Sequence, residues 1–88
     1  MKIAICDDDK NDLRYIYKII SEALNRKNIS GEFNLYTSSE KLLDENKECK
    51  FDVIFLDLDM PETDGMKVAS YINKLNELTE IIFVTNHD

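Results

Sequence analysis

Short apolar runs alternate with stretches of helical spacing along the whole chain, and this alternation constrains the fold more than any other feature. Uninterrupted apolar runs occupy residues 3–6, 53–56 and 81–84. Continuous runs of this length are typical of β-strands that are covered on both faces. Phe33 and Leu35 instead alternate with polar neighbours, as in a strand at or near a sheet edge. The pattern therefore predicts four strands.

Helical periodicity fills the three intervals between these strands. In the first interval, apolar residues recur every three or four positions: Leu13, Ile16, Ile20 and Leu24. This helix is expected to begin after Asp9 and to end in the polar stretch before Gly31. A capping-box pattern from Thr37 to Glu40 predicts the start of a short second helix. A third helix is marked by Val68, Ala69, Ile72 and Leu75.

The predicted order β-α-β-α-β-α-β indicates an α/β fold with a parallel sheet and helices on both faces. A chain of 88 residues has room for one small domain, residues 1–88, with a thin core. In such sheets ligands bind outside the carboxyl ends of the strands, where the strand order reverses. A functional site is therefore expected at that edge.

Composition excludes several classes of function. The net charge of −7 opposes direct binding to nucleic acid or to an anionic membrane. The sequence has no run of about 18 apolar residues and no segment like a signal peptide, so we expect a cytoplasmic protein. Cys6 and Cys49 lack the spacing of a disulfide framework or a zinc site. We interpret Cys6 as a small buried apolar residue and both thiols as chemically idle.

Acidic residues follow two of the predicted strands. Asp7 and Asp8 come directly after the first strand, and Asp57 comes directly after the third. If these strands are neighbours, about 4.8 Å apart, the three carboxylates meet in one pocket. Such carboxylates raise one another's pKa unless a cation neutralises them, and hard oxygen ligands at a wet edge suit Mg²⁺. Asp9 is better interpreted as the N-cap of the first helix.

Three motifs occur in order, each at the carboxyl end of a predicted strand. They are Ile5-Cys6-Asp7-Asp8-Asp9, then Ile54-Phe55-Leu56-Asp57-Leu58-Asp59-Met60-Pro61 with Asp64-Gly65, and finally Phe83-Val84-Thr85. Together they resemble the motifs of bacterial response-regulator receiver domains. The last motif, extended to Asn86-His87, is most similar to regulators with a LytTR-type DNA-binding output domain. The resemblance implies a flavodoxin-like, doubly wound parallel sheet with strand order 2-1-3-4.

The resemblance also implies a role for each matching residue. Asp57 would be the phosphoacceptor that takes a phosphoryl group from a sensor histidine kinase. Asp8 would bind Mg²⁺ directly, Asp7 would bind it through water, and the backbone carbonyl of Asp59 would be a further ligand. Thr85 would contact the phosphoryl group and begin the conformational switch. Control of transcription would follow through an output domain, which is also the only part expected to contact DNA.

Receiver domains continue with a fourth helix, a fifth strand and a fifth helix, which this sequence lacks, so an incomplete domain is expected. The missing strand carries the family's lysine partner of the phosphoryl group, and transfer without it is expected to be slow or absent. The fourth strand, residues 81–84, would then be an exposed apolar edge. We therefore expect the chain to associate with itself at that edge.

Two other functions are weighed against a phosphorylated receiver. The first is a truncated receiver that is never phosphorylated and works only by docking or dimerisation. The second is an enzyme, because Asp57-Leu58-Asp59 also resembles the nucleophile and acid of haloacid-dehalogenase-type phosphatases. Those enzymes carry the pair after their first strand and need a longer chain. A receiver, by contrast, undergoes phosphoryl transfer onto its own aspartate and is not expected to be a turnover enzyme.

Overall fold

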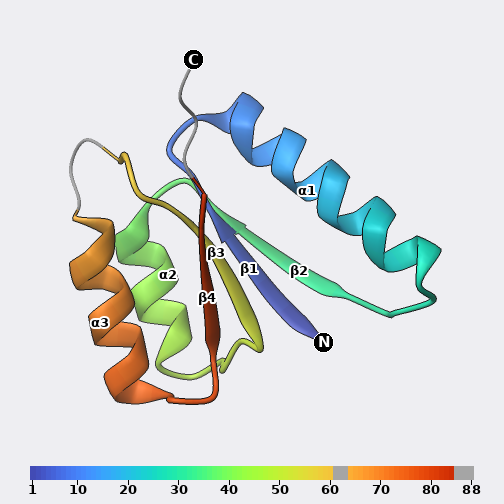
Figure 1. The fold of residues 1–88 in the computed structure, drawn as a ribbon. Helices are drawn as coiled ribbons and strands as arrows, with labels where there is room; N and C mark the ends of the chain where they lie inside the picture. The colour runs from blue at the N-terminus through green and yellow to red at the C-terminus, as the bar shows by residue number, and fades with distance from the viewer. Residues whose placement is uncertain (61–63, 85–88) are drawn as a thin grey trace.

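The computed structural model describes residues 1–60 and 64–84, and within them the predicted alternation of strands and helices is confirmed (Figure 1). Each helix lies between two strands along the chain. The bounds are β1 Lys2–Cys6, α1 Lys10–Arg26, β2 Glu32–Tyr36, α2 Ser39–Asn46, β3 Val53–Asp57, α3 Gly65–Leu75 and β4 Glu80–Val84.

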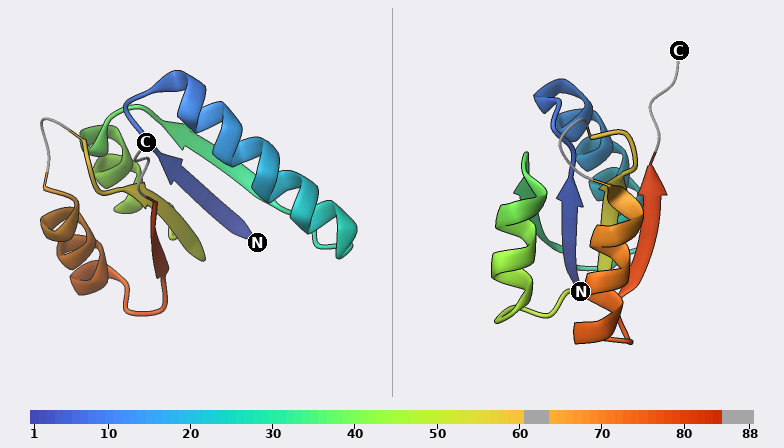
Figure 2. Two further views of the ribbon diagram at one scale, coloured as in Figure 1. Left: turned by 45° about the horizontal axis from the view of Figure 1, so that its top comes forward. Right: turned by 90° about the vertical axis from the view of Figure 1, so that its left-hand side faces the viewer.

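The strands form one parallel sheet in the order β2-β1-β3-β4, which confirms the predicted strand order 2-1-3-4. The strand arrows in Figure 2 accordingly point the same way. Cys6, the last residue of β1, is level with Tyr36 on one side and with Leu56 on the other. The residues that follow Cys6 and Leu56 therefore lie at the same edge of the sheet, and these residues are Asp7, just past β1, and Asp57, the last residue of β3.

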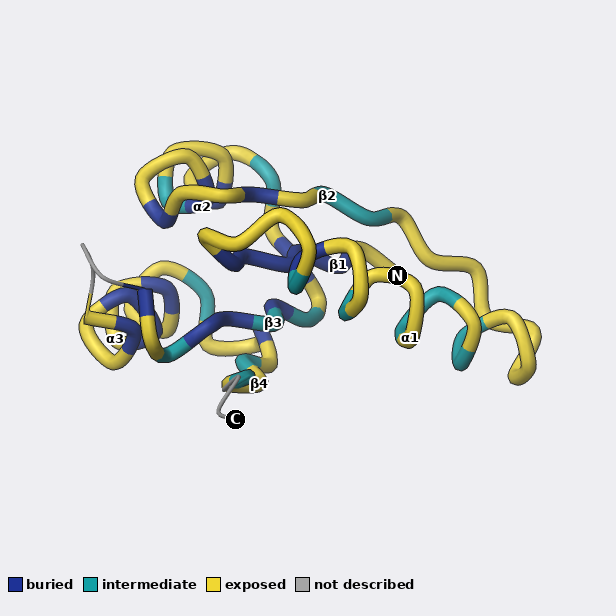
Figure 3. Tube along the Cα trace, turned by 90° about the horizontal axis from the view of Figure 1, so that it is seen from above, coloured by how far each residue is buried: buried dark blue, intermediate teal, exposed yellow. Residues whose placement is uncertain are grey.

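The helices divide between the two faces of the sheet. Figure 3 shows α2 and α3 on one side and α1 on the other, with the buried residues concentrated along β1 and β3. The larger core lies beneath α2 and α3 and includes Leu42, Ile54 and Ile72, which are fully buried. The smaller core lies beneath α1 and joins Ile3, Ile5 and Leu13 to half-buried side chains of α1, β2 and β3. Both faces of the centre of the sheet are therefore covered.

Aspartate or serine side chains fix the starts of the helices. Asp9 is the N-cap of α1, as predicted, and its carboxylate accepts hydrogen bonds from the backbone N–H groups of the first turn. The prediction that Thr37 begins the second capping box is wrong, because Ser38 is the N-cap of α2 and its hydroxyl accepts from the N–H of Lys41. The bonding of β2 continues to the carbonyl of Tyr36, which accepts the N–H of Asp7. Thr37 therefore lies in the connection between β2 and α2, one residue before the helix cap.

The strand β4 is the least covered part of the described sheet. A continuous apolar run predicts coverage on both faces, but Ile82 is 46% exposed and Phe83 is 36% exposed. Neither face of β4 is fully covered: α1 packs on β1, β2 and β3, and on the other face Ile81 packs against the larger core while α3 leaves a groove beside Phe83. Leu75, expected on the buried side of the third helix, is also exposed, since it is the last residue of α3. No helix among the described residues is long and apolar enough to cross a bilayer.

Candidate functional site

The three carboxylates singled out from the sequence meet at the carboxyl edge of the sheet. One oxygen from each of Asp7, Asp8 and Asp57 lies within 4.8 Å of the others. Asp7 and Asp57 are almost completely buried, whereas Asp8 is exposed. The predicted convergence is confirmed, and it follows from the direct pairing of β1 with β3.

Each of the two buried carboxylates is held by a turn of the same kind, formed with the backbone two residues further along the chain. Asp7 Oδ1 accepts a hydrogen bond of 2.9 Å from the backbone N–H of Asp9, and Asp57 Oδ1 accepts one of 2.9 Å from the N–H of Asp59. Aspartate favours such turns because its short side chain reaches the backbone two residues further on. Each carboxylate is thus oriented by the chain that leaves its own strand, before any ligand is present.

The cluster is electrostatically unfavourable by itself. The pKa of Asp7 is raised from 3.8 to about 6. Burial is the largest cause, the hydrogen bond from the Asp9 N–H opposes it, and the negative charges of Asp57, Asp12 and Asp8 add to it. The pKa of the neighbouring Cys6 thiol is raised to about 12, first by burial and then by the charges of Asp7, Asp57 and Asp8. A cation would relieve this concentration of negative charge.

Close packing supports the floor of the site. The Cys6 thiol contacts Met60 Sδ at 3.9 Å, and both side chains are buried, so Cys6 is the small buried residue that was predicted. Gly65, at the start of α3, lies so close to the chain after β3 that a Cβ atom there would be 3.2 Å from Leu58 Cα and 3.4 Å from the carbonyl oxygen of Asp57. Glycine therefore permits α3 to begin directly against the chain that carries Asp57.

Of the other residues predicted for the site, the structure describes Asp59 but not Thr85 or Pro61. Asp59 has an exposed side chain and donates its N–H to Asp57, whereas the role of its backbone carbonyl as a metal ligand stays a prediction. Thr85 lies outside the described residues, as does Pro61. Sequence reasoning missed Asp12, whose charge acts on Asp7 from the first turn of α1. Its place five residues after Asp7, at the start of a helix, was the available signal.

The donor set of this cluster is chemically suited to a hard divalent cation. All three ligating groups are carboxylate oxygens, which Mg²⁺ and Ca²⁺ prefer. The Cys6 thiol, next to Asp7 in the chain, is buried against Met60 and has a pKa of about 12, so it is not a thiolate ligand. The donor set of the three carboxylates fits a partly hydrated Mg²⁺.

Comparison with known proteins agrees with this geometry. The family model of the response regulator receiver domain matches residues 3–88. The sensory transduction protein LytR of Staphylococcus epidermidis is 34% identical over 91 residues, and the accessory gene regulator protein A of the same species is 34% identical over 93. The matches cover 100% and 99% of this chain, but only 33% and 38% of those proteins. The chain thus spans about a third of the length of these relatives.

Solved structures show the same fold. The BeF3-activated receiver domain of DrrB is 31% identical and superposes with a TM-score of 0.75, covering 99% of this chain and 67% of that one. A receiver domain from Clostridium thermocellum is 26% identical with a TM-score of 0.80, covering 98% and 65%. The response regulator TrrA of Thermotoga maritima, in complex with Mg²⁺ and BeF, is 26% identical with a TM-score of 0.74, covering 99% and 70%.

Proposed function

The chain belongs to the response regulator receiver domain family, and from this premise we propose that it accepts a phosphoryl group on Asp57 from a histidine kinase, with Mg²⁺ held by Asp7, Asp8 and Asp57. The observation that carries the proposal is the meeting of these three carboxylates within 4.8 Å at the carboxyl edge of the sheet. The phosphoacceptor role is carried over to Asp57 by its position in the family's motif at the end of β3.

The chain's own groups support a metal-assisted reaction. Asp7 is buried among like charges, and its raised pKa of about 6 means that a divalent cation would stabilise its ionised form. When bound, Mg²⁺ would neutralise the carboxylates and the charge on the transferring phosphoryl oxygens. The solved structure of TrrA is described as a complex with Mg²⁺ and BeF, which supports the same type of ligand here. Asp59 is proposed to add its backbone carbonyl to the ligand set.

Asp57 is oriented for the transfer by its own strand end. The N–H of Asp59 holds Oδ1, so the carboxylate cannot rotate freely and its second oxygen can form the bond to phosphorus. As this P–O bond forms, the bond from phosphorus to the imidazole nitrogen of a phosphohistidine breaks and its electron pair stays on the nitrogen. The product is an acyl phosphate on Asp57. A hydroxyl contact from Thr85 to the phosphoryl group is part of the proposal and rests on the motif alone.

Intact mass measurement tests the proposal directly. The purified chain is incubated with acetyl phosphate and Mg²⁺ and then weighed. We expect a slow gain of one phosphoryl group over a long incubation, because the family's lysine partner is not in this sequence; the gain is lost in Asp57→Asn and retained in Asp44→Asn, a matched change at an exposed residue of α2. A gain that persists in Asp57→Asn contradicts the assignment of the phosphoacceptor. Turnover of a generic phosphate ester would instead favour the phosphatase hypothesis.

A second candidate function is a docking module that is never phosphorylated, and the exposed apolar side chains of β4 favour it. Absence of any mass gain in the wild-type chain would leave two interpretations, this docking module and an inactive part of a phosphorylated receiver. We also propose self-association through β4, because among the described residues this strand pairs only with β3 and keeps one edge open. Light scattering should show a dimer or larger species at micromolar concentration, and a clean monomer would contradict this.

Control of transcription is proposed for a protein as long as the relatives, of which this chain spans about a third. The similar protein of Staphylococcus aureus is named transcriptional regulatory protein LytR, and this chain is 32% identical to it over 34% of its length. We propose that the segment described here is the phosphorylation switch, that a separate output domain contacts DNA, and that the protein works in the cytoplasm. The net charge of −7 agrees with the absence of direct DNA contact by this segment.

A further inference from the structure

A hydrogen bond joins a cysteine to a lysine at the amino-terminal end of the sheet, at the other end from the carboxylate cluster. Cys49 lies in the connection between α2 and β3, and its Sγ atom accepts a hydrogen bond of 3.5 Å from Nζ of Lys2, the first residue of β1. The two residues are 47 positions apart in the sequence. The sequence places no second cysteine or histidine near Cys49, so it predicts an idle thiol, but the fold supplies a lysine.

Backbone hydrogen bonds hold both partners of this contact. The N–H of Lys2 donates to Asp52 Oδ2 at 2.7 Å, and the Lys2 carbonyl accepts the N–H of Asp52 at 2.8 Å. The N–H of Cys49 donates to the carbonyl of Glu45 at 2.8 Å, so helical bonding continues from α2 to the cysteine. These contacts involve β1, α2 and the chain before β3, and they therefore do not depend on what covers β4.

The lysine ammonium is available to the sulfur. Within residues 1–60 and 64–84 the salt bridge found joins Lys47 to Asp44, and none includes Lys2. An ammonium group that donates to a sulfur atom stabilises the thiolate, and the thiolate is the form that attacks disulfides. Cys49 is half-exposed, so a small reagent can reach it, whereas Cys6 is buried. The structure thus distinguishes the two thiols by partner and by access.

The last residue of α2 is a second unusual feature of the same helical turn. Asn46 is 3% exposed, and its Nδ2 and Oδ1 atoms have no hydrogen-bond partner among the described residues. It lies three positions before Cys49 on one side of the helical chain, and Cys49 packs against the larger core. A buried amide without a partner destabilises the closed arrangement. It therefore favours opening of this turn, which would hydrate the amide and expose the thiol.

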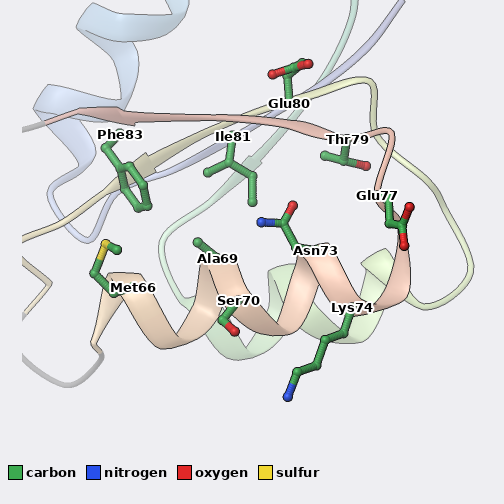
Figure 4. Close-up of a pocket in the computed structure, with 10 residues that line it drawn as sticks. All are labelled: Met66, Ala69, Ser70, Asn73, Lys74, Glu77, Thr79, Glu80, Ile81 and Phe83. Atoms are coloured by element: carbon green, nitrogen blue, oxygen red, sulfur yellow. The ribbon is translucent and has the colours of Figure 1, made fainter.

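The groove of about 560 Å³ between α3 and β4 provides a contrast and a control. Figure 4 shows its side chains, which include Lys74 but no cysteine in the described lining. Lys74 is exposed and extends from α3 away from β4 (Figure 4). A lysine in this groove therefore has no thiol to act on. Lys74→Gln removes the same charge as Lys2→Gln on a different element, so it is a matched control.

We propose that Cys49 is a site of reversible modification by small-molecule disulfides, with Lys2 as a positioning residue that stabilises the attacking sulfur. The thiolate sulfur of Cys49 forms a bond to one sulfur of the reagent, and the S–S bond of the reagent breaks. The other half leaves as a thiolate and takes up the proton that Cys49 lost, so no further oxidant is needed. Because the added group cannot stay packed against the larger core, the mixed disulfide keeps the last turn of α2 open. Phosphorylation of Asp57 is not required.

Intact mass measurement over time with bis(hydroxyethyl) disulfide at neutral pH tests this inference. This reagent is uncharged, so long-range attraction by a lysine does not change its rate of approach. We expect one adduct on the wild-type chain and none on Cys49→Ser. Lys2→Gln should slow the reaction about threefold, Lys2→Arg should restore the rate because it keeps the charge, and Lys74→Gln should leave the rate unchanged. The adduct should lower the Tm by about 4 °C or more, and dithiothreitol should restore it.

Four outcomes would overturn the inference, after circular dichroism has verified that each variant is folded. An adduct on Cys49→Ser would place the reaction at Cys6. A wild-type rate for Lys2→Gln would exclude a role for the lysine, and an equal slowing by Lys74→Gln would reduce that role to a general effect of charge. An adduct that leaves the Tm unchanged would show that the last turn of α2 does not open.

Discussion

Replacing Asp7 with asparagine should stabilise the folded chain when no divalent cation is present. The Asp7 carboxylate is 1% exposed and faces the charges of Asp57, Asp12 and Asp8, so its ionised form is unfavourable in the folded state. An asparagine amide stays neutral, and its oxygen can still accept the N–H of Asp9 that Asp7 Oδ1 accepts now. The substitution therefore removes the buried charge and keeps the turn.

The magnitude follows from the pKa of Asp7, which rises from 3.8 in the unfolded chain to about 6 in the folded one. Between these values the folded state binds more protons than the unfolded state, so stability falls as the pH rises through this window. The full penalty is present above about pH 6, where each unit of pKa difference is about 1.4 kcal/mol, so the total is at most about 3 kcal/mol. We expect a gain of about 1–3 kcal/mol for Asp7→Asn at about pH 8 and little gain at about pH 4.

Thermal unfolding followed by circular dichroism, in buffer with a chelator, provides the assay. A gain of 1 kcal/mol raises the Tm of a domain of this size by about 4–8 °C. Asp9→Asn is the matched control, because it removes the same charge at an exposed position and asparagine is an equally good N-cap. Equal Tm values for Asp7→Asn and the wild type at about pH 8 would refute the reasoning, as would a gain that does not depend on pH.

Magnesium should make the wild-type chain more stable than Asp7→Asn, which reverses the order of stability expected with a chelator. Added Mg²⁺ stabilises the folded wild-type chain by an amount that grows with the logarithm of its concentration over its Kd, whereas Asp7→Asn lacks one of the three carboxylates and gains less. Protons compete with the cation for Asp7, so the stabilisation by Mg²⁺ should weaken as the pH falls through about 6. An equal Mg²⁺-dependent rise in Tm for both proteins would exclude Asp7 from the ion's surroundings.

Other parts of the structure give three further predictions. Cys49 is half-exposed and should react with a thiol reagent at neutral pH in the native chain. Cys6 is buried and has a pKa of about 12, so it should react only after unfolding. Equal reaction rates of the two thiols in the native chain would contradict this. Ile54→Ala should destabilise the chain by about 2–5 kcal/mol in urea unfolding, since Ile54 is completely buried in the larger core. Ser38→Ala should lower the free energy of unfolding by about 1 kcal/mol and Thr37→Ala by much less, because Ser38 is the N-cap of α2. A larger loss for Thr37→Ala would mean that Thr37 is the N-cap, as the sequence predicted.

The sequence by itself determined the succession of elements and the edge at which the acidic residues gather. Periodicities of two and of three to four residues reflect which side of a strand or helix meets the core, so they can be read before the chain is folded. Asp7 and Asp57 each come directly after an apolar run, and in a parallel sheet this position places both at one edge. The N-cap role of Asp9 was equally local, because a cap bonds only to the next few residues.

Only the tertiary structure decided how each carboxylate of the cluster is situated and what is left uncovered. Asp7 is buried and Asp8 is exposed although they are neighbours, because β1 and the turn into α1 direct them to different surroundings. The charge of Asp12 acts on Asp7 only because α1 begins beside the sheet edge. The apolar run of β4 predicted a covered strand, yet coverage depends on which elements pack against it, and α1 packs on the other strands. Periodicity reports which residues can be buried, whereas long-range packing determines which of them are.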